Sequence, residues 1–213
     1  MRRIFTTLII VLGFYSLSSA QGFYGPSSAT PQKGSVEFGF NIGLNSAYVQ
    51  DANSNQHTDG VAGLNVGVSA ETYFSDQWGL KLKVIYDQKG WANGYLDFGD
   101  VEEDGVVYKL NYITVPLMAD WHFGRSKNWY LDFGPYVGFL TSANAGGYDV
   151  KSAFNTVDGG ISLGLGVKIP ISNKAKFFIE YEGQGGVSNV FQATSDGSNV
   201  QNVRGSLNIG VNF

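Results

Sequence analysis

The sequence has no cysteine, only five prolines and no long apolar run after its first twenty residues. Without cysteine, neither a disulfide framework nor a lipid-modified N-terminal cysteine is possible. A membrane-spanning helix needs about 20 consecutive apolar residues, so residues 21–213 are not expected to contain one. Acidic residues outnumber basic ones, 18 to 14, so the formal net charge is −4. An acidic chain without a basic patch argues against nucleic acid as a partner.

The first 20 residues have the features of a secretory signal peptide. Arg2 and Arg3 precede a short apolar run, and small residues end with Ala20, after which we predict cleavage. An uncleaved anchor is the alternative, which the short run disfavours. We therefore expect a signal peptide over 1–20, a short periplasmic segment over 21–35 and one barrel domain over 36–213.

Glycine, aromatic and β-branched residues are abundant, a composition that suits strands. Eight segments alternate apolar and polar residues with a period of two, which indicates strands; they are 36–48, 61–74, 78–87, 108–123, 129–140, 159–171, 177–187 and 203–213. Their connections alternate between short (75–77, 124–128 and 172–176) and long (49–59, 88–107, 142–156 and 188–200). This pattern predicts an all-β fold, an eight-stranded antiparallel up-and-down transmembrane β-barrel with short periplasmic turns and long extracellular loops.

Alternation alone would also fit a soluble, lipocalin-like barrel with its apolar face inward. The polar face decides between the two, because it is rich in Gly, Asn and Ser rather than in the Lys and Glu of a water-facing surface. Small residues suit the narrow interior of eight strands. The charged residues of this face should then form an interior charge network, which comprises Glu37, Glu71, Lys81, Lys83, Asp120, Asp132, Lys168, Glu180, Glu182 and Arg204.

Extending the three short turns as hairpins predicts which interior charges face each other: Glu71 and Lys81, Lys168 and Glu180, and Asp120 and Asp132. The second pair follows from placing Ile171 opposite Phe177. Opposite charges across a strand pair are stabilising, whereas two facing carboxylates repel. We therefore expect Arg204, Lys81 or Lys83 near the two aspartates, or one of these carboxyls to be protonated.

Aromatic residues gather near the short turns and the end of the chain; we predict that Phe74, Trp78, Trp121, Phe123, Trp129, Phe177 and Phe213 lie at the membrane interface. Packing in a soluble core is the alternative. The last strand should pair with the first, because an open edge is not tolerated in lipid. A terminal aromatic, Phe213, also resembles the signal with which the barrel-assembly machinery recognises outer-membrane barrels.

The segments "YITVPLMADWHF" and "WYLDFGPYVGFL" resemble the central hairpin of the PorT-like outer-membrane β-barrel family. "FFIEYEGQGGVSNV" and the ending "NVRGSLNIGVNF" are similar to its later strands. The resemblance spans residues 36–213 and implies an outer-membrane barrel. Because one component of the family is linked to protein secretion and gliding, the resemblance also implies an alternative function, that of an accessory subunit in such a machine.

Catalytic motifs are missing: the sequence has no G-x-S-x-G, no H-E-x-x-H and no phosphate-binding loop. We expect no enzyme, no cofactor and no metal. His122 lies on the polar face and should be structural, with a proton switch as the alternative. His57, near Ser54 and Asp59 in the first long loop, keeps a lipid-modifying enzyme open as a further hypothesis.

Two groups of carboxylates each allow a second interpretation. The second long loop is acidic, with Asp97, Asp100, Glu102, Glu103 and Asp104, and should be solvated. It could instead bind a divalent cation, although the spacing does not fit a Ca²⁺ loop. The facing Asp120 and Asp132 could suggest a glycosidase, but eight strands leave no room for a sugar chain.

The prediction is a monomeric barrel in the outer membrane of a Gram-negative-type cell, with both termini periplasmic and four mobile loops outside. Its leading function is non-enzymatic, the presentation of loops for surface interaction or envelope integrity. The expected partners are outer-membrane lipid and lipopolysaccharide, the barrel-assembly machinery during insertion, and secretion-machine or surface partners.

Overall fold

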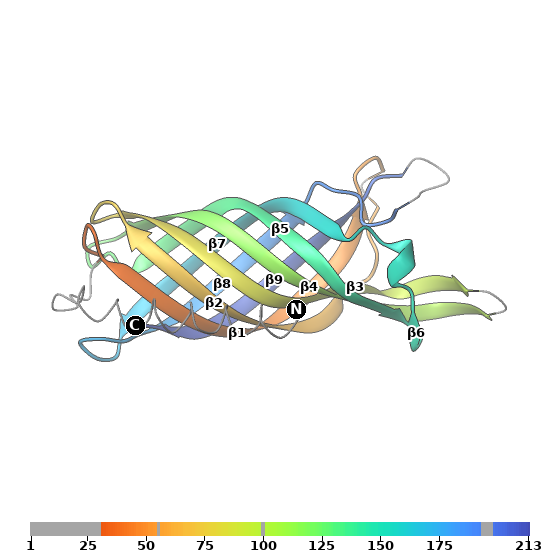
Figure 1. Ribbon diagram of the computed structural model, residues 1–213, viewed down its shortest axis with the longest axis horizontal. Coiled ribbons are helices and arrows are strands. Elements are labelled where there is room, and N and C mark those ends of the chain that lie inside the picture. Colours follow the sequence, from red (N-terminus) through yellow and green to blue (C-terminus); the bar gives the residue numbers. More distant parts are fainter. Residues whose placement is uncertain (1–30, 55, 99–100, 193–197) are drawn as a thin grey trace, which may run out of the picture.

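The computed structural model describes residues 31–213 apart from residues 55, 99–100 and 193–197 (Figure 1). The predicted signal peptide over 1–20 and residues 21–30 of the predicted periplasmic segment lie outside the described residues. The strands are β1 (Val36–Asp51), β2 (Val61–Tyr73), β3 (Trp78–Phe98), β4 (Val101–Phe123), β5 (Trp129–Ala145), β6 (Tyr148–Asp149), β7 (Val157–Pro170), β8 (Lys176–Gly186) and β9 (Val200–Asn212), with one 3₁₀ turn, η2 (Lys151–Ala153). In the described part of the chain, no helix has the length and apolar character that a membrane crossing needs.

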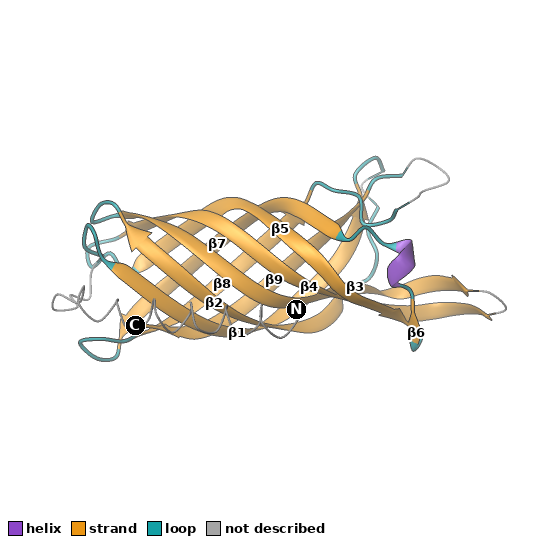
Figure 2. Cartoon of the chain, in the orientation of Figure 1, coloured by secondary structure: helices purple, strands orange, loops and turns teal. Residues whose placement is uncertain are grey.

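The described strands close into a ring of eight antiparallel strands, as predicted (Figure 2). β1 pairs with both β2 and β9, and β4 pairs with both β3 and β5. The short β6 pairs with the end of β5 and stands outside the ring. Closure brings the start of β1 and the end of β9 together at the end of the barrel that carries the short turns, where Phe38 and Phe213 exchange two backbone hydrogen bonds of 2.9 Å (Figure 1).

The two faces of the wall follow the alternation of the sequence. Large apolar side chains point outward, and Leu44 and Ile161 are 66% and 62% exposed. The inward face combines small residues with a few large ones, because eight strands leave room for little more than side chains. A Cβ atom on Gly166 would lie only 2.3 Å from the Tyr130 ring, and one on Gly210 only 2.5 Å from the Phe178 ring. Glycine at these two positions therefore makes room for an inward aromatic ring.

The second long connection is not a loop, contrary to the prediction. Residues 88–98 and 101–107 continue β3 and β4 as a hairpin that projects beyond the barrel (Figure 1). The alternation fails here for a local reason, since Gly90 and Asn93 have positive φ angles of 141° and 55° and the ladder shifts register after Trp91. In the third long connection, β5 likewise continues to Ala145 and is followed by β6.

One predicted charge pair is wrong. The turn between β7 and β8 closes with hydrogen bonds from the backbone N–H groups of Ile171 and Ser172 to the carbonyl of Ala175, so Pro170 rather than Ile171 begins the ladder, opposite Lys176. Phe177 accordingly pairs with Ile169. A shift of two residues leaves every side chain on its predicted face, but Lys168 lies opposite Phe178, and Glu180 lies opposite Gly166.

Candidate functional site

The half of the bore nearest the short turns contains a cluster of ion pairs around Lys81. Its Nζ lies 2.7 Å from Asp132 Oδ2, 3.3 Å from Asp120 Oδ2 and 3.5 Å from Glu71 Oε2. Glu71 is the residue opposite Lys81 in the ladder, and Asp120 lies opposite Asp132, both as predicted. The carboxylates are completely buried, so Lys81 provides the positive charge that two facing aspartates require.

Lys168 links this cluster to the rim of the barrel. Its Nζ donates to Glu71 Oε2 at 2.7 Å, to the Tyr73 hydroxyl at 2.8 Å and to Glu37 Oε2 at 3.2 Å. The other Glu37 oxygen accepts a hydrogen bond from Lys176. Lys168 is on β7 and Glu71 is on β2, so the interaction crosses the bore instead of running along a hairpin.

Farther along the bore, between this cluster and the long connections, lies a second set of ion pairs. Lys83 Nζ lies 2.8 Å from Glu180 Oε1 and also binds Glu182. Arg204 Nη2 donates to Glu182 Oε1 at 2.8 Å, and its Nε lies 3.3 Å from Asp87 Oδ2. All ten residues of the predicted network therefore face the bore.

Four further members of this network were not predicted; they are Asp87, Lys89, Asp158 and Lys176. Asp87 and Lys89 continue the odd-numbered inward positions of β3 beyond Lys83. Asp87 is the last residue of the predicted strand and was left out of the network, whereas Lys89 lies two residues beyond that strand and would have been found by carrying the alternation further. Asp158 and Lys176 each stand one residue before the segment predicted as a strand.

His122 lies among the charges at the short-turn end. Its Nδ1 donates to the Lys127 carbonyl at 2.9 Å, and its Nε2 lies 3.1 Å from Asp120 Oδ2 and 3.3 Å from Glu71 Oε1. Within the described ranges, Glu71, Asp120 and His122 form the one group of three acidic or histidine residues close enough to share a metal ion. Lys81 and Lys168 already bind these carboxylates, and their charges would repel a divalent cation, so the three residues belong to the ion network.

Amide side chains fill the remaining polar space. Asn41 donates to Asn65, which donates both to Asn45 and to Asn208, at 2.7–2.9 Å. Asn45 in turn donates to Asp87 at 2.8 Å. A cavity lined by Lys81, Tyr130 and Phe178, among others, measures about 10 Å³, which is hardly enough for one water molecule. A bore packed in this way leaves no room at the facing Asp120 and Asp132 for a sugar chain.

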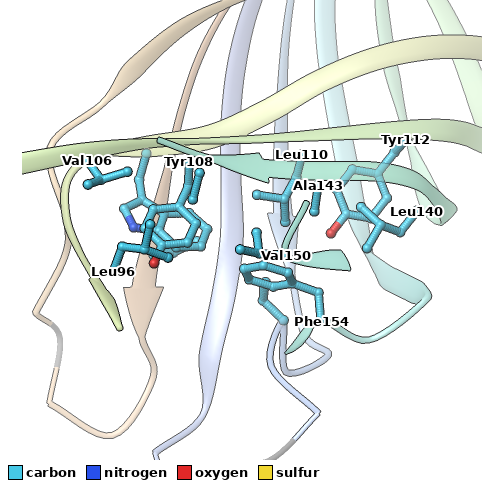
Figure 3. Packing of buried hydrophobic residues seen from close by; sticks show 13 residues of the cluster. Leu96, Val106, Tyr108, Leu110, Tyr112, Leu140, Ala143, Val150 and Phe154 are labelled. Carbon is cyan, nitrogen blue, oxygen red and sulfur yellow. The ribbon is translucent and has the colours of Figure 1, made fainter. Parts of the chain in front are cut away.

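The mouth of the bore at the end of the long connections is closed by a different kind of packing (Figure 3). Trp91 stacks on Tyr108 with ring centroids 4.4 Å apart, and Phe154 lies 5.9 Å from Trp91 and 5.1 Å from Phe191. The buried members of this outer aromatic core are Val49, Trp91, Leu96, Val106, Tyr108, Leu110, Tyr112, Leu140, Ala143, Ala145, Val150, Phe154 and Val190. They come from all four long connections and the adjoining strand ends. Connections predicted as mobile loops therefore share one packed core in their described residues.

The predicted interface aromatics lie on the outer wall near the short turns and the paired chain end. Phe74, Trp129 and Phe213 are about half exposed, and Trp78 stacks on Trp121 with centroids 6.1 Å apart. Phe123 packs against Trp121, and Phe177 is partly buried. Their contact with a membrane interface remains a prediction.

The residues that suggested a lipid-modifying enzyme are not assembled into a triad. The His57 Nδ1 contacts the Thr58 carbonyl at 3.2 Å, and the Ser54 hydroxyl donates to Asp51 at 2.8 Å. Asp59 instead accepts a hydrogen bond from Asn93.

The acidic residues near the tip of the β3–β4 hairpin lie on strands. Asp97 is directly opposite Glu102, and Glu102, Glu103 and Asp104 are exposed. Asp100 lies outside the described residues. The described acidic residues therefore point into solvent, as expected.

Residues 20–192 match the family described as the outer membrane protein beta-barrel domain. The fold is similar to that of OprG from Pseudomonas aeruginosa, with 13% identity over 86% of this chain and 97% of that one and a TM-score of 0.53. Neisserial surface protein A (18% identity, 82% and 95% coverage, TM-score 0.49) and Ail of Yersinia pestis (14% identity, 85% and 100% coverage, TM-score 0.46) are also similar. No curated protein matches the sequence. The chain therefore belongs to the outer membrane protein β-barrel domain family and is a transmembrane β-barrel of the Gram-negative outer membrane.

Proposed function

We propose that this protein is a monomeric, non-enzymatic anchor that presents a preformed surface outside the cell, for surface interaction or envelope integrity. The observation that supports this proposal is that two kinds of side-chain packing fill the bore. Ion pairs fill the bore inside the barrel wall, and the outer aromatic core closes the mouth at the end of the long connections. A barrel filled in this way is a membrane support, and its largest structured projection is the β3–β4 hairpin with the neighbouring connections.

Orientation is part of the proposal, with the signal peptide removed, the short turns and both termini in the periplasm and the hairpin outside. Because the chain has no cysteine of its own, labelling of a single introduced cysteine shows on which side of the membrane that position lies. Tyr95→Cys in the hairpin should react with a membrane-impermeant maleimide on intact cells, and Ser126→Cys in a short turn should react only after lysis. The reverse labelling pattern would overturn the orientation.

The function itself is tested by complementing a deletion strain. The full chain should restore envelope permeability and surface adhesion, whereas a chain in which residues 92–106 are replaced by Asn-Gly should insert normally and fail to restore them. Full rescue by the shortened chain would contradict a role for the outer surface. Membrane extraction and the heat-dependent gel mobility of folded barrels serve as the controls for assembly.

The resemblance of residues 36–213 to PorT-like barrels supports a second candidate, an accessory subunit of a protein-secretion or gliding machine. Extraction in a mild detergent distinguishes the two. A partner that co-purifies in stoichiometric amount, together with loss of secreted proteins in the deletion strain, would favour the secretion role. A lone barrel and an unchanged set of secreted proteins would favour the anchor.

A further inference from the structure

The outer end of the molecule is acidic at its surface. Its exposed described acids are Asp59, Asp97, Glu102, Glu103, Asp104 and Asp149. Within the described part of this end, the cations that reach the surface are Lys109, which is exposed, and Lys151, which is partly exposed. Lys89 and Arg204 point inward and are bound in ion pairs.

Lys109 lines one groove on the outer wall, and Lys151 is linked to the lining of this groove through Thr141. The groove measures about 580 Å³, which is in the range of small-ligand sites. It lies between β4 and the turn that joins β5 to β6. Lys109 and Asn144, which pair across these strands, and Gly147 in the turn all form part of its lining. Lys151 Nζ donates to the Thr141 carbonyl at 3.0 Å, and the Thr141 hydroxyl donates to the carbonyl of Asn111, another lining residue, at 2.8 Å. The Lys151 ammonium group is therefore held on β5, beside the strand β4 that carries Lys109.

The groove begins where the apolar outer wall ends. On β4 the outward residues run from Ile113 through Asn111 to Lys109, and the neighbouring Tyr86 of β3 is followed outward by Gln88. At about 3.3 Å per residue and a tilt of about 45°, Lys109 stands roughly 9 Å above Ile113 along the membrane normal. That height matches the polar headgroup layer, while acyl chains would continue along the wall below.

We propose that this groove binds the phosphorylated sugar headgroup of an outer-leaflet lipid. Lysine is a good point-charge partner for phosphate, and Lys109 and Lys151 supply two such charges on an otherwise acidic surface. The amides of Gln88 and Asn144 and the carboxylate of Glu103 offer donors and acceptors for sugar hydroxyls. The proposal rests on the proposed outward orientation, which places the groove in the leaflet that carries such lipids.

The test uses the purified full-length protein in detergent and diphosphorylated lipid A as the probe, with native mass spectrometry as the readout. Each lysine near a charged lipid surface contributes about fivefold in affinity, so the double variant Lys109→Gln/Lys151→Gln should bind roughly 25-fold more weakly. The control, Lys127→Gln/Lys174→Gln, removes two lysines at the short-turn end and should bind like the unaltered protein. Asn144→Trp, which fills the groove and keeps both lysines, should also weaken binding.

Two further measurements distinguish recognition of the lipid headgroup from simple anion binding. Dephosphorylated lipid A should bind weakly to the unaltered protein, and inorganic phosphate should not compete at equal concentration. Equal affinity of the double variant and its control, or full competition by inorganic phosphate, would overturn the proposal. Detergent exposes both ends of the barrel, so this result is independent of orientation. Failure of the Tyr95→Cys labelling would overturn the proposed function and leave the binding result standing.

Discussion

The two ends of the bore are filled by opposite chemistry. Around Lys81, one ammonium group is surrounded by three buried carboxylates. Around Trp91, stacked and edge-to-face rings form an apolar core (Figure 3). The difference reflects the solvent outside the wall. Where the wall faces hydrocarbon, its apolar side chains point outward and alternation forces polar groups inward. Where the strands and their connections extend into water, the usual order returns, with apolar groups inside and polar groups outside.

The polar half depends on partners from distant strands. Lys168 of β7 binds Glu71 of β2, and Lys83 of β3 binds Glu180 and Glu182 of β8. Such ion pairs add little net stability compared with well-packed apolar residues, but the loss of one partner leaves an uncompensated buried charge. The aromatic half depends on shape and volume instead, so a deletion there should leave a cavity without an unpaired charge.

The largest effect is expected from Lys81→Met, which leaves Asp120 and Asp132 facing each other without a cation. The free energy of unfolding should fall by about 3–5 kcal/mol, measured by urea unfolding in lipid vesicles. Leu82→Met, the next residue on the lipid-facing side, is the matched control and should cost less than about 1.5 kcal/mol. A loss below about 1 kcal/mol for Lys81→Met would show that the bore is hydrated or differently paired.

Phe154→Ala probes the aromatic half. Phe154 is 1% exposed and contacts Trp91, Tyr108 and Phe191, so the core should lose about 3 kcal/mol. The loss should be local: hydrogen exchange should accelerate in the four outer connections and stay unchanged in the strands around Lys81. Equal acceleration in both regions would mean that the two halves unfold as one unit. Phe154→Leu should show a smaller effect in the same places.

Lys89→Met tests the boundary between the halves. Lys89 Nζ lies 2.9 Å from Asp158 Oδ2 and 4.6 Å from the centre of the Tyr136 ring. Asp158 keeps hydrogen bonds from the Tyr136 and Ser188 hydroxyls, so the cost should be about 1.5–3 kcal/mol, less than at Lys81. Adding Asp158→Asn should recover part of this loss in a double-mutant cycle. Strict additivity of the two changes would rule out a direct pair.

The smallest effect is expected in the β3–β4 hairpin, outside both halves of the bore, where the change in stability should be a gain instead of a loss. Glu102→Gln removes a like-charge contact with Asp97 directly across the hairpin, which should stabilise it by about 0.2–1 kcal/mol. Hairpin amides should exchange more slowly, and the gain should shrink in high salt because exposed charges are screened. Asp149→Asn, which removes a charge from β6 rather than from this pair, serves as the control. A destabilised hairpin in the first variant would contradict the contact.

The charge pairs show how far local pattern predicts tertiary contacts. Glu71 and Lys81, and Asp120 and Asp132, were predicted correctly because tight turns transmit register over a few residues. Lys168 and Glu180 were paired wrongly because the prediction placed Ile171 opposite Phe177. In the structure Pro170 lies opposite Lys176, which shifts the register by two residues. The true partner of Lys168, Glu71, is 97 residues away in sequence, and no local pattern encodes a contact across the bore.

The sequence by itself determined which side chains face lipid and which face the bore, because a strand alternates with a period of two whatever surrounds it. It also determined that the interior had to be charged and small. Only the tertiary structure decided that Lys81 lies between two aspartates, that β3 and β4 continue as a projecting hairpin, and that four separate connections share one aromatic core. Those features depend on ring closure and strand register, which bring together residues that no short stretch of sequence relates.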